Sequence, residues 1–135
     1  MAKPQRVTYF KANLEDKPGT LLAVLKNLKS ENIGLNGLWG YSTFGGKGEL
    51  IVIPKDPRKA KNAWRSTGIP AEEGTGFFQK GTDKTGALLK SLEAIANAGV
   101  NIRAIDAVAV GGRYGTFIWV APEEVEKAAL ALGTK

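Results

Sequence analysis

Apolar and polar residues alternate along several short stretches of the chain, and each stretch predicts a β-strand. In chain order these stretches are RVTYFKANL from Arg6, LNGLWGYST, ELIVI, GFFQKG, IRAIDAVAV and TFIWV. Two apolar stripes with helical spacing lie between them: Leu21, Leu25 and Leu28, and later Leu88, Leu92 and Ile95. Each half of the chain therefore combines strands with a helix.

The two halves repeat each other at a spacing of 67 residues, without a gap. The matching positions include a turn before the helix, the leucine stripe, the entry to the next strand and the glycines of a hairpin. Examples are Asp16 with Asp83, Gly19 with Gly86, Leu25 with Leu92, Ile33 with Val100, and Gly45 with Gly112. Because the register holds across such different segments, the pattern indicates an internal duplication of one supersecondary unit.

Each copy predicts the order β-α-β-β-α. The glycine-rich turns FGGKG and GGRYG join the second and third strands. Asp56 with Pro57 is expected to open the last helix of the first copy, and Gly99 to end the first helix of the second. A fourth strand is harder to place. IPAEEGTGFFQKG must supply it for the first copy and also begin the second copy, and little remains after Gly133.

This order predicts an α+β protein made of two ferredoxin-like βαββαβ units, at residues 5–70 and 71–133. Each unit is expected to be an antiparallel sheet with its helices on one face. The third strands are apolar on both faces, since Ile51 and Ile53 alternate with Leu50 and Val52. Helices cover only one face, so the other is expected to meet a second sheet, a neighbouring subunit or a ligand.

Composition narrows the chemistry that the chain can perform. The 135 residues are 43% hydrophobic and include no cysteine and no histidine. Disulfides, thiolate sites, the commonest general base and the commonest zinc ligands are therefore excluded. The sequence also has no carboxylate cluster with metal-ligand spacing, so we expect neither an enzyme nor a cofactor.

The net charge of +6 belongs to the first half of the chain. Residues 1–68 carry 12 Lys and Arg against 5 Asp and Glu, and the remainder carries 7 against 8. Much of the excess lies in KDPRKAKNAWR, which predicts a solvated helix face, with a phosphate-binding patch as the alternative. No signal segment is visible, and no apolar run approaches the roughly 20 residues of a membrane span, so we expect a cytoplasmic protein.

The same short turn, DKPG or DKTG, opens the first helix of each copy. As a helix start it is ordinary, because Pro18 suits a first helical turn and Asp16 favours the positive end of a helix. The turn can also bind a ligand, because the first amides of a helix lack internal partners and favour an anion. Amides next to Gly19 or Gly86 would hold a carboxylate, and Asp16 or Asp83 an ammonium group. An α-amino acid carries both charges.

The run LEDKPGTLLAVLKNLKSENIGLNGL resembles the start of an ACT domain, and GTDKTGALLKSLEAIANAGVNIRAI resembles a second one. The hallmarks are the Asp-x-Pro-Gly turn, the leucine-rich helix and the GVNI entry to the next strand. The resemblance covers nearly the whole chain, as a tandem pair. It implies a regulatory module that binds amino acids, or other small metabolites, between paired domains. It also implies a homodimer, and a free-standing pair that acts through a partner enzyme or regulator, or as a sensor or carrier.

The resemblance also implies site residues by position. In the first copy they are Asp16, Pro18, Gly19, Thr20 and Leu21, with Asn36 two residues beyond the matching Gly34; in the second they are Asp83, Gly86, Ala87, Leu88 and Asn101. The copies differ, because Thr85 replaces Pro18, so the two sites are not expected to be equivalent. Gly86→Val is expected to remove a response of the second copy while leaving the fold intact.

Two rival functions remain open. The first is a dimerisation module without a ligand. The second is RNA binding, because GRYGTFIWV is similar to the aromatic third-strand motif of RNA-binding modules. The order of residues in this motif differs, and the basic first copy has no aromatic residue in GKGELIVIP. A stacking platform and a phosphate-binding surface would need to lie together, so nucleic-acid binding is not expected.

Overall fold

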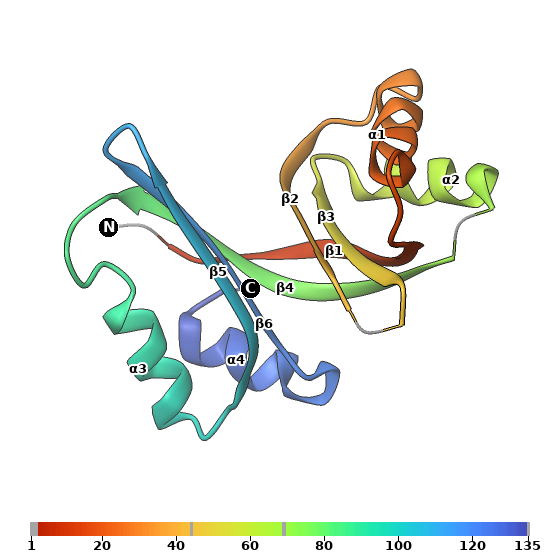
Figure 1. Ribbon diagram of the computed structural model, residues 1–135. Coiled ribbons are helices and arrows are strands. Elements are labelled where there is room, and N and C mark those ends of the chain that lie inside the picture. The colour runs from red at the N-terminus through yellow and green to blue at the C-terminus, as the bar shows by residue number, and fades with distance from the viewer. Residues whose placement is uncertain (1–2, 44, 69, 135) are drawn as a thin grey trace. The chain divides into compact units, whose positions relative to one another are not determined.

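A computed structural model describes residues 3–43, 45–68 and 70–134 (Figure 1). The strands are β1 (Gln5–Glu15), β2 (Leu35–Ser42), β3 (Lys47–Pro54), β4 (Ala71–Thr82), β5 (Ile102–Val110) and β6 (Arg113–Val120). The helices are α1 (Thr20–Ser30), α2 (Pro57–Thr67), α3 (Leu89–Asn97), the short 3-10 helix η1 (Pro122–Glu124) and α4 (Val125–Leu132). Residue 44, in the predicted FGGKG turn, lies outside the described residues.

The chain forms two compact units. The first unit, Thr8–Gly74, contains the turn at Asp16. The second unit, Met1–Val7 with Thr75–Lys135, contains the turn at Asp83. The sheet order is β2-β3-β1-β4-β6-β5, and the pairs β1/β3, β2/β3, β4/β6 and β5/β6 are antiparallel. In each unit the first and third strands are therefore central, which is the ferredoxin-like arrangement expected from the sequence.

The source of the fourth strand follows from the bounds of the units. Residues 71–74 of β4 belong to the first unit, and the rest of β4 opens the second, as the sequence predicted. The second unit takes its fourth strand from residues 5–7 of β1, at the other end of the chain. The sequence pattern did not reveal this, because a segment of three residues carries no recognisable periodicity. The division into domains at residues 70 and 71 stays a prediction.

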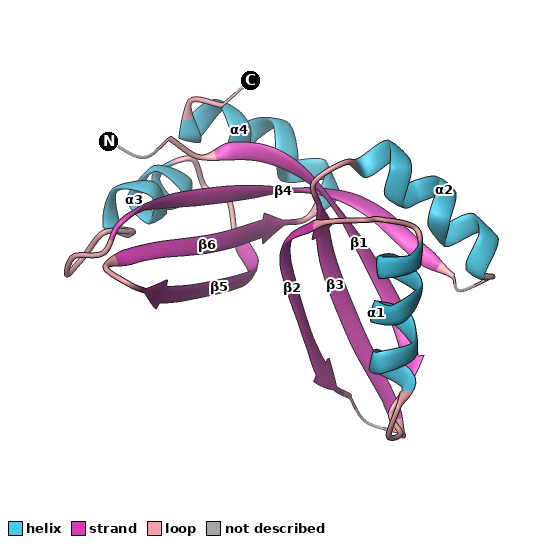
Figure 2. Cartoon of the chain, turned by 90° about the horizontal axis from the view of Figure 1, so that it is seen from above, coloured by secondary structure: helices cyan, strands magenta, loops and turns pink. Residues whose placement is uncertain are grey.

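Each unit has its own hydrophobic core between its sheet and its two helices. In the first unit Leu50 and Val52 of β3 pack in one cluster with α1 and α2. In the second unit Ile118 and Val120 of β6 pack with α3 and α4, and Figure 2 shows these two helices on the same side of β4, β5 and β6. The predicted helix layer on one face is thus present in both units.

The apolar stripes of the helices differ in detail from the prediction. In α1 the buried residues are Val24 and Leu28, whereas Leu21 is exposed. In α3 Ile95 is buried as expected, but Leu88 precedes the helix as its N-cap. The spacing identified the helices correctly and placed the start of the buried stripe one turn too early.

The opposite faces of the central strands are buried too. Ile51 and Ile53 are fully covered although they do not belong to the cluster beneath the helices. In the second unit the Phe117 ring is 1% exposed on the face away from Ile118. It packs over Gly76, where an added Cβ would lie 2.3 Å from the ring. The Phe117 ring thus fills the space that a side chain at Gly76 of the neighbouring strand would occupy.

The predicted helix ends are present. Asp56 accepts a hydrogen bond from the Lys59 amide at 3.2 Å, with Pro57 as the first residue of α2. Gly99 has a φ of +74° after α3, and the next amide, of Val100, bonds back to the Ile95 carbonyl at 3.2 Å. This glycine-based helix end satisfies carbonyls that the helix itself leaves unpaired.

Candidate ligand-binding site

The first turn connects β1 to α1 through a left-handed glycine. The Asp16 amide donates to the Gly46 carbonyl at 2.9 Å, which joins the turn to the β2–β3 hairpin. Gly19 is the N-cap of α1, with a φ of +90°. Pro18 therefore precedes the N-cap and does not occupy the first helical turn, contrary to the sequence-based prediction. The glycine is required for backbone conformation, since L-residues with a side chain rarely adopt this φ.

The second turn repeats this geometry and then departs from it. The Asp83 amide donates to the Gly112 carbonyl at 2.9 Å, and Gly86 has a φ of +79°. The amides of Ala87 and Leu89 bond back to the Lys84 and Gly86 carbonyls, each at 3.1 Å. An irregular turn therefore precedes α3, which begins at Leu89, two residues later than the repeat would place it.

The amides that the sequence offered as an anion site are only partly available. The Thr20 amide points to the Lys17 carbonyl at 3.4 Å, and the Ala87 amide is bonded within its turn. Within the described residues, no hydrogen bond is formed by the amides of Leu21 and Leu88. Backbone donors thus remain free at each helix start, where the helix dipole favours a negative group.

Each turn lines a hollow of its unit. The first-turn hollow, about 250 Å³, and the second-turn hollow, about 370 Å³, lie between the turn, the helix start and the far half of the second strand. Seven lining positions correspond at the spacing of the repeat. They are Asp16, Lys17, Thr20, Leu21, Gly40, Tyr41 and Ser42 in the first hollow, and Asp83, Lys84, Ala87, Leu88, Ala107, Val108 and Ala109 in the second.

The first-turn hollow has more polar side chains among its lining residues than the second, including Glu15, Thr20 and Ser42. On the face of the sheet away from α1, the Tyr41 hydroxyl donates to Glu49 Oε1 at 3.0 Å, and Lys11 lies 3.5 Å from the same carboxylate. Lys17 pairs with Glu15 at 2.8 Å. This hydrogen bond, and then the opposite charges, lower the pKa of Glu15 and raise that of Lys17. Both side chains are exposed, so solvent weakens the pair.

The second-turn hollow is apolar beyond its turn. Leu89, Leu92 and three residues of β5 line it, and Tyr114 supplies the one remaining polar side chain. Behind it, the Ser91 hydroxyl donates to Gln79 Oε1, and Gln79 Nε2 donates to the Tyr114 hydroxyl, both at 2.6 Å. Sequence reasoning missed this chain of hydrogen bonds. Its signal was a glutamine two residues after Phe77 in GFFQKG, on the same face of the strand, at a position that is 5% exposed.

A third and larger hollow, about 760 Å³, lies in the first unit on the side of α1 that faces the end of α2. Pro18, Gly19 and Thr20 line it together with Asn27 and Thr67. Thr20 Oγ1 and Asn27 Oδ1 are buried and have no hydrogen-bond partner in the described part of the chain. The first turn thus borders two hollows.

The two asparagines implied by the family resemblance lie elsewhere. Asn36 is exposed in the irregular start of β2, and Asn101 is exposed just before β5. Neither lines any of the three hollows. An 11-residue helix such as α1 is about 16 Å long and separates the turn from Asn36. A role for Asn36 or Asn101 in a site with the turn of its own unit is not supported by this geometry.

Gly86 is unsuitable for the substitution that the sequence suggested. Its φ is positive, and an added Cβ would lie 3.2 Å from Leu89 Cδ1. Gly86→Val would strain the backbone and displace a lining residue, so loss of binding could not be separated from a local change of fold. Asp83, which has no positive φ, gives a cleaner test.

The basic run forms the exposed face of α2, as predicted. Lys59 Nζ donates to the Asn32 carbonyl at 2.9 Å, and Lys61 lies 3.5 Å from Glu73. In β6 the Phe117 ring is buried and makes an edge-to-face contact with Trp119, with ring centroids 5.7 Å apart. A buried ring cannot stack on a base, which argues against the RNA-binding alternative.

The described residues contain no group of three or more His, Cys, Asp or Glu that could hold a metal ion. Every helix in the described ranges is too short or too polar to cross a membrane.

No protein-family model matches the chain, and no curated protein matches it. Solved structures do match. The protein BT0572 from Bacteroides thetaiotaomicron superimposes with a TM-score of 0.82 and 25% identity, over 96% of this chain and 88% of that one. The ligand-free regulatory subunit of aspartate kinase from Thermus thermophilus superimposes with a TM-score of 0.65 and 18% identity, over 98% of this chain and 94% of that one. The regulatory subunit of aspartate kinase from Thermus flavus superimposes with a TM-score of 0.62 and 16% identity, over 98% of this chain and 94% of that one.

The chain has an ACT-like fold. Among its structural neighbours are regulatory subunits of aspartate kinase, whose ACT-type units are ferredoxin-like. The resemblance noted in the sequence is therefore confirmed at the level of the fold.

Proposed function

We propose that this chain is a regulatory module that binds an α-amino acid beside its duplicated turns and signals the bound state to a partner protein. The observation that carries the proposal is the repeated hollow, lined by seven corresponding positions in the two units. The repetition includes residues of the second strand as well as the helix start. A turn that served only to begin a helix would not require corresponding residues of the second strand beside it.

The lining groups suit a zwitterion. A carboxylate, Asp16 or Asp83, is available for an ammonium group in each hollow. A free amide, of Leu21 or Leu88, and the neighbouring lysine can bind a carboxylate at the positive helix end. Volumes of about 250 and 370 Å³ are near the lower end of the range for small-molecule sites, roughly 300–1,000 Å³.

The regulatory part of the proposal is supported by the neighbours in structure. Their names describe regulatory subunits of aspartate kinase. By analogy, this module would bind its ligand without transforming it and would act on a separate enzyme or regulator. Binding alters a partner only if the ligand favours one conformation or assembly state over another.

A ligand-free dimerisation module is the second candidate function. It is favoured by β5, the edge strand of the second unit, where Ile105, Val108 and Val110 are exposed. An edge strand with exposed apolar side chains is a surface on which another chain can pair.

Thermal unfolding of the purified chain with each of the twenty amino acids at millimolar concentration tests the proposal. A ligand present at 100 times its Kd stabilises the folded state by about 2.7 kcal/mol, enough to raise Tm by several degrees. The double variant Asp16→Asn, Asp83→Asn should lose this response. Asp106→Asn, on β5 outside the hollows, should keep it.

Failure to respond to any amino acid, confirmed by calorimetry, would exclude the proposed function. A chain that forms dimers in sedimentation experiments and shows no ligand response would instead support the dimerisation module.

A further inference from the structure

The chain contains a single Asn-Gly pair, Asn36 and Gly37, and this pair lies at an irregular point of the edge strand β2. We propose that Asn36 is a site of spontaneous covalent modification, at which the side-chain amide is released as ammonia and an aspartate or isoaspartate is formed. The structure of the strand decides whether the folded protein permits this reaction. No ligand takes part, so the modification does not depend on the proposed function.

Asn36 is the extra residue of a β-bulge. In the pairing of β2 with β3, Leu35 lies opposite Pro54. The next pair is Gly37 with Ile53, which leaves Asn36 without a partner residue in the ladder. In a regular strand the hydrogen bonds on either side fix the rotation about each Cα–C bond, whereas the extra residue of a bulge is left unpaired. Asn36 can therefore rotate and bring the nitrogen of Gly37 within reach of its own side-chain carbonyl carbon.

The side chain of Asn36 is accessible to solvent and to the attacking nitrogen. Asn36 is exposed, and within the described residues its amide forms no hydrogen bond that would hold it in another position. Solvent access matters because hydroxide must remove the proton of the attacking nitrogen. Gly37 has no Cβ, so the approach to its nitrogen is not hindered by a side chain.

Packing explains why a glycine follows Asn36. Gly37 has no positive φ, but an added Cβ would lie 3.1 Å from Trp39 Cζ3 and 3.2 Å from Ile53 Cδ1. Ile53 is 1% exposed, so its side chain has little room to move. A larger residue at position 37 would slow the attack, but it would also disturb this buried packing. The fold therefore favours the residue that makes Asn36 reactive.

The reaction is a ring closure followed by hydrolysis. The backbone nitrogen of Gly37, after losing its proton to hydroxide, attacks Asn36 Cγ. The N–Cγ bond forms, the Cγ–Nδ2 bond breaks, and Nδ2 takes up protons from water and leaves as ammonia. Water then opens the succinimide ring at either of its two carbonyls, which gives aspartate or isoaspartate. The net reaction consumes water and releases ammonia, without oxidation or reduction.

Either product changes the edge of the sheet. Each adds a negative charge to β2, in a chain whose net charge is +6, and isoaspartate also lengthens the backbone. Charged side chains on an edge strand hinder its pairing with another chain. Modification of Asn36 would therefore make this edge less able to pair with a second molecule.

The second unit has the same bulge without the reactive pair. Arg103 is the extra residue between Ile102 and Ala104 of β5, at the spacing of the repeat from Asn36. An arginine side chain has no amide that could close the ring. The bulge thus belongs to the duplicated scaffold, whereas the chemistry belongs to the first copy, and the second copy supplies a control within the same molecule.

Peptide mass spectrometry of the whole chain, after incubation in mildly alkaline buffer, tests the proposal. Asn36 should be converted about tenfold or more faster than each of the other six asparagines, because it combines a following glycine with an unpaired place in the ladder. Both aspartate and isoaspartate should appear at position 36. Direct hydrolysis of the amide would give aspartate alone. Asn36→Gln should stop the conversion, since its longer side chain does not close the same ring.

Two matched variants separate the bulge from the Asn-Gly sequence. The double variant Arg103→Asn, Ala104→Gly places the pair in the second bulge and should react within about threefold of the rate at Asn36. The double variant Asp106→Asn, Ala107→Gly places it in the regular part of the same edge strand, where both residues are exposed and paired with β6. There it should react about tenfold or more slowly, because the ladder holds the backbone.

The comparison of Asn36 with the other asparagines needs no variant, so it decides the matter even if a variant fails to fold by circular dichroism. The proposal is overturned if Asn36 reacts no faster than they do, or if isoaspartate is absent. It is also overturned if the pair in the regular strand reacts as fast as Asn36, since the sequence alone would then account for the reaction.

Discussion

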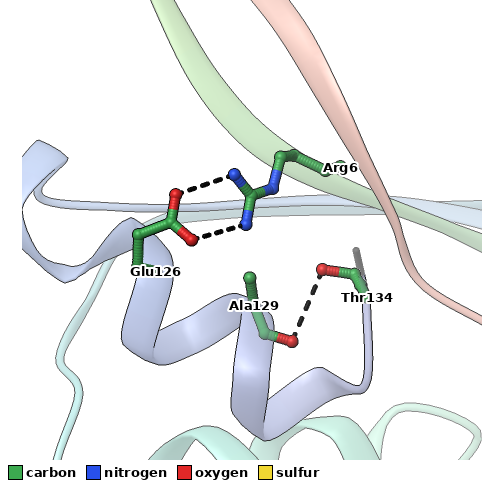
Figure 3. Close-up of polar contacts among 4 residues, drawn as sticks. All are labelled: Arg6, Glu126, Ala129 and Thr134. Carbon is green, nitrogen blue, oxygen red and sulfur yellow. Dashed lines mark hydrogen bonds and ion pairs between the residues drawn. The ribbon is translucent and has the colours of Figure 1, made fainter.

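Arg6 and Glu126, 120 residues apart in the chain, form a double hydrogen bond, with Nη1–Oε1 at 2.9 Å and Nη2–Oε2 at 3.0 Å (Figure 3). Arg6 lies near the start of β1 and Glu126 in the first turn of α4, and both belong to the second unit. The pair therefore joins the N-terminal segment of the second unit to the last helix of that unit. Bidentate geometry of this kind is more specific than a single lysine contact.

Removal of the Glu126 charge should make the stability of the second unit less dependent on pH. The hydrogen bonds from Arg6, and then its charge, lower the pKa of Glu126. A lowered pKa means that the pair stabilises the fold above the ordinary glutamate value and that this contribution is lost as pH falls through the folded-state value. Glu126→Gln should therefore lower Tm at pH 7, and the difference from the wild type should decrease as pH falls below the ordinary glutamate range.

The matched control for this prediction is Glu123→Gln, since Glu123 is exposed and forms no ion pair among the described residues. It should leave the pH profile unchanged. High salt should also reduce the effect of Glu126→Gln, because the pair is solvent-accessible. An equal loss of stability at pH 3 and pH 7 would contradict an ionic role for Glu126.

A chain that begins at Thr8 should lose the structure of its second unit. The deletion removes residues 5–7 of β1, which supply the fourth strand there, and the partner of Glu126. Hydrogen exchange should show loss of protection in β4, which borders β1 in the sheet, and in α4. Retention of full protection in both elements would show that the second unit does not depend on the N-terminal end of the chain.

Gln79→Leu should destabilise the second unit by about 1–3 kcal/mol, because it breaks two hydrogen bonds and leaves partly buried hydroxyls without partners. Ser91→Ala removes only one of these bonds and should cost about 1 kcal/mol. Denaturant unfolding of both single variants and of the double variant measures their coupling. Strictly additive effects would show that the two bonds do not act as one network.

Two threonine substitutions should differ although the chemistry of the change is the same. Thr116 is 2% exposed, and its hydroxyl donates to the Asp106 carbonyl at 2.7 Å. Thr116→Val should cost about 1 kcal/mol, since that carbonyl loses a donor. Thr20 Oγ1 is buried without a partner among the described residues, so Thr20→Val should be neutral or stabilising. Denaturant unfolding of the two variants measures the difference, and an equal cost would indicate a bound water at Thr20.

Much of the fold could be predicted because it depends on local patterns. Alternation and helical spacing identified the strands and helices, and Asp56 and Gly99 marked helix ends through their own side chain or backbone preference. The repeat located the two turns, because the same four-residue pattern recurs at the same place in each copy. The start of α3 was misplaced because Thr85 and its neighbours form an irregular turn whose hydrogen bonds have no sequence signature.

The candidate site was only partly predictable. The turn residues were identified by their spacing and their charge. The second-strand residues that line the hollows, such as Ser42 and Ala109, were not, because they come near the turn only through the register of the sheet. Asn36 and Asn101 were favoured by the family resemblance, and the length of the helix places Asn36 far from the turn of its own unit.

The sequence by itself determined the number of copies, the order of elements and the two turns, because each depends on residues that are close together in the chain. Only the tertiary structure decided that residues 5–7 complete the second unit and that residues 107–109 of β5 line the hollow beside the turn at Asp83. Strand pairing brings together residues that are distant in sequence. A short strand has too few apolar positions for its sequence to identify the strand with which it pairs. The two hollows thus differ in the strand residues that line them, although their turns have almost the same sequence.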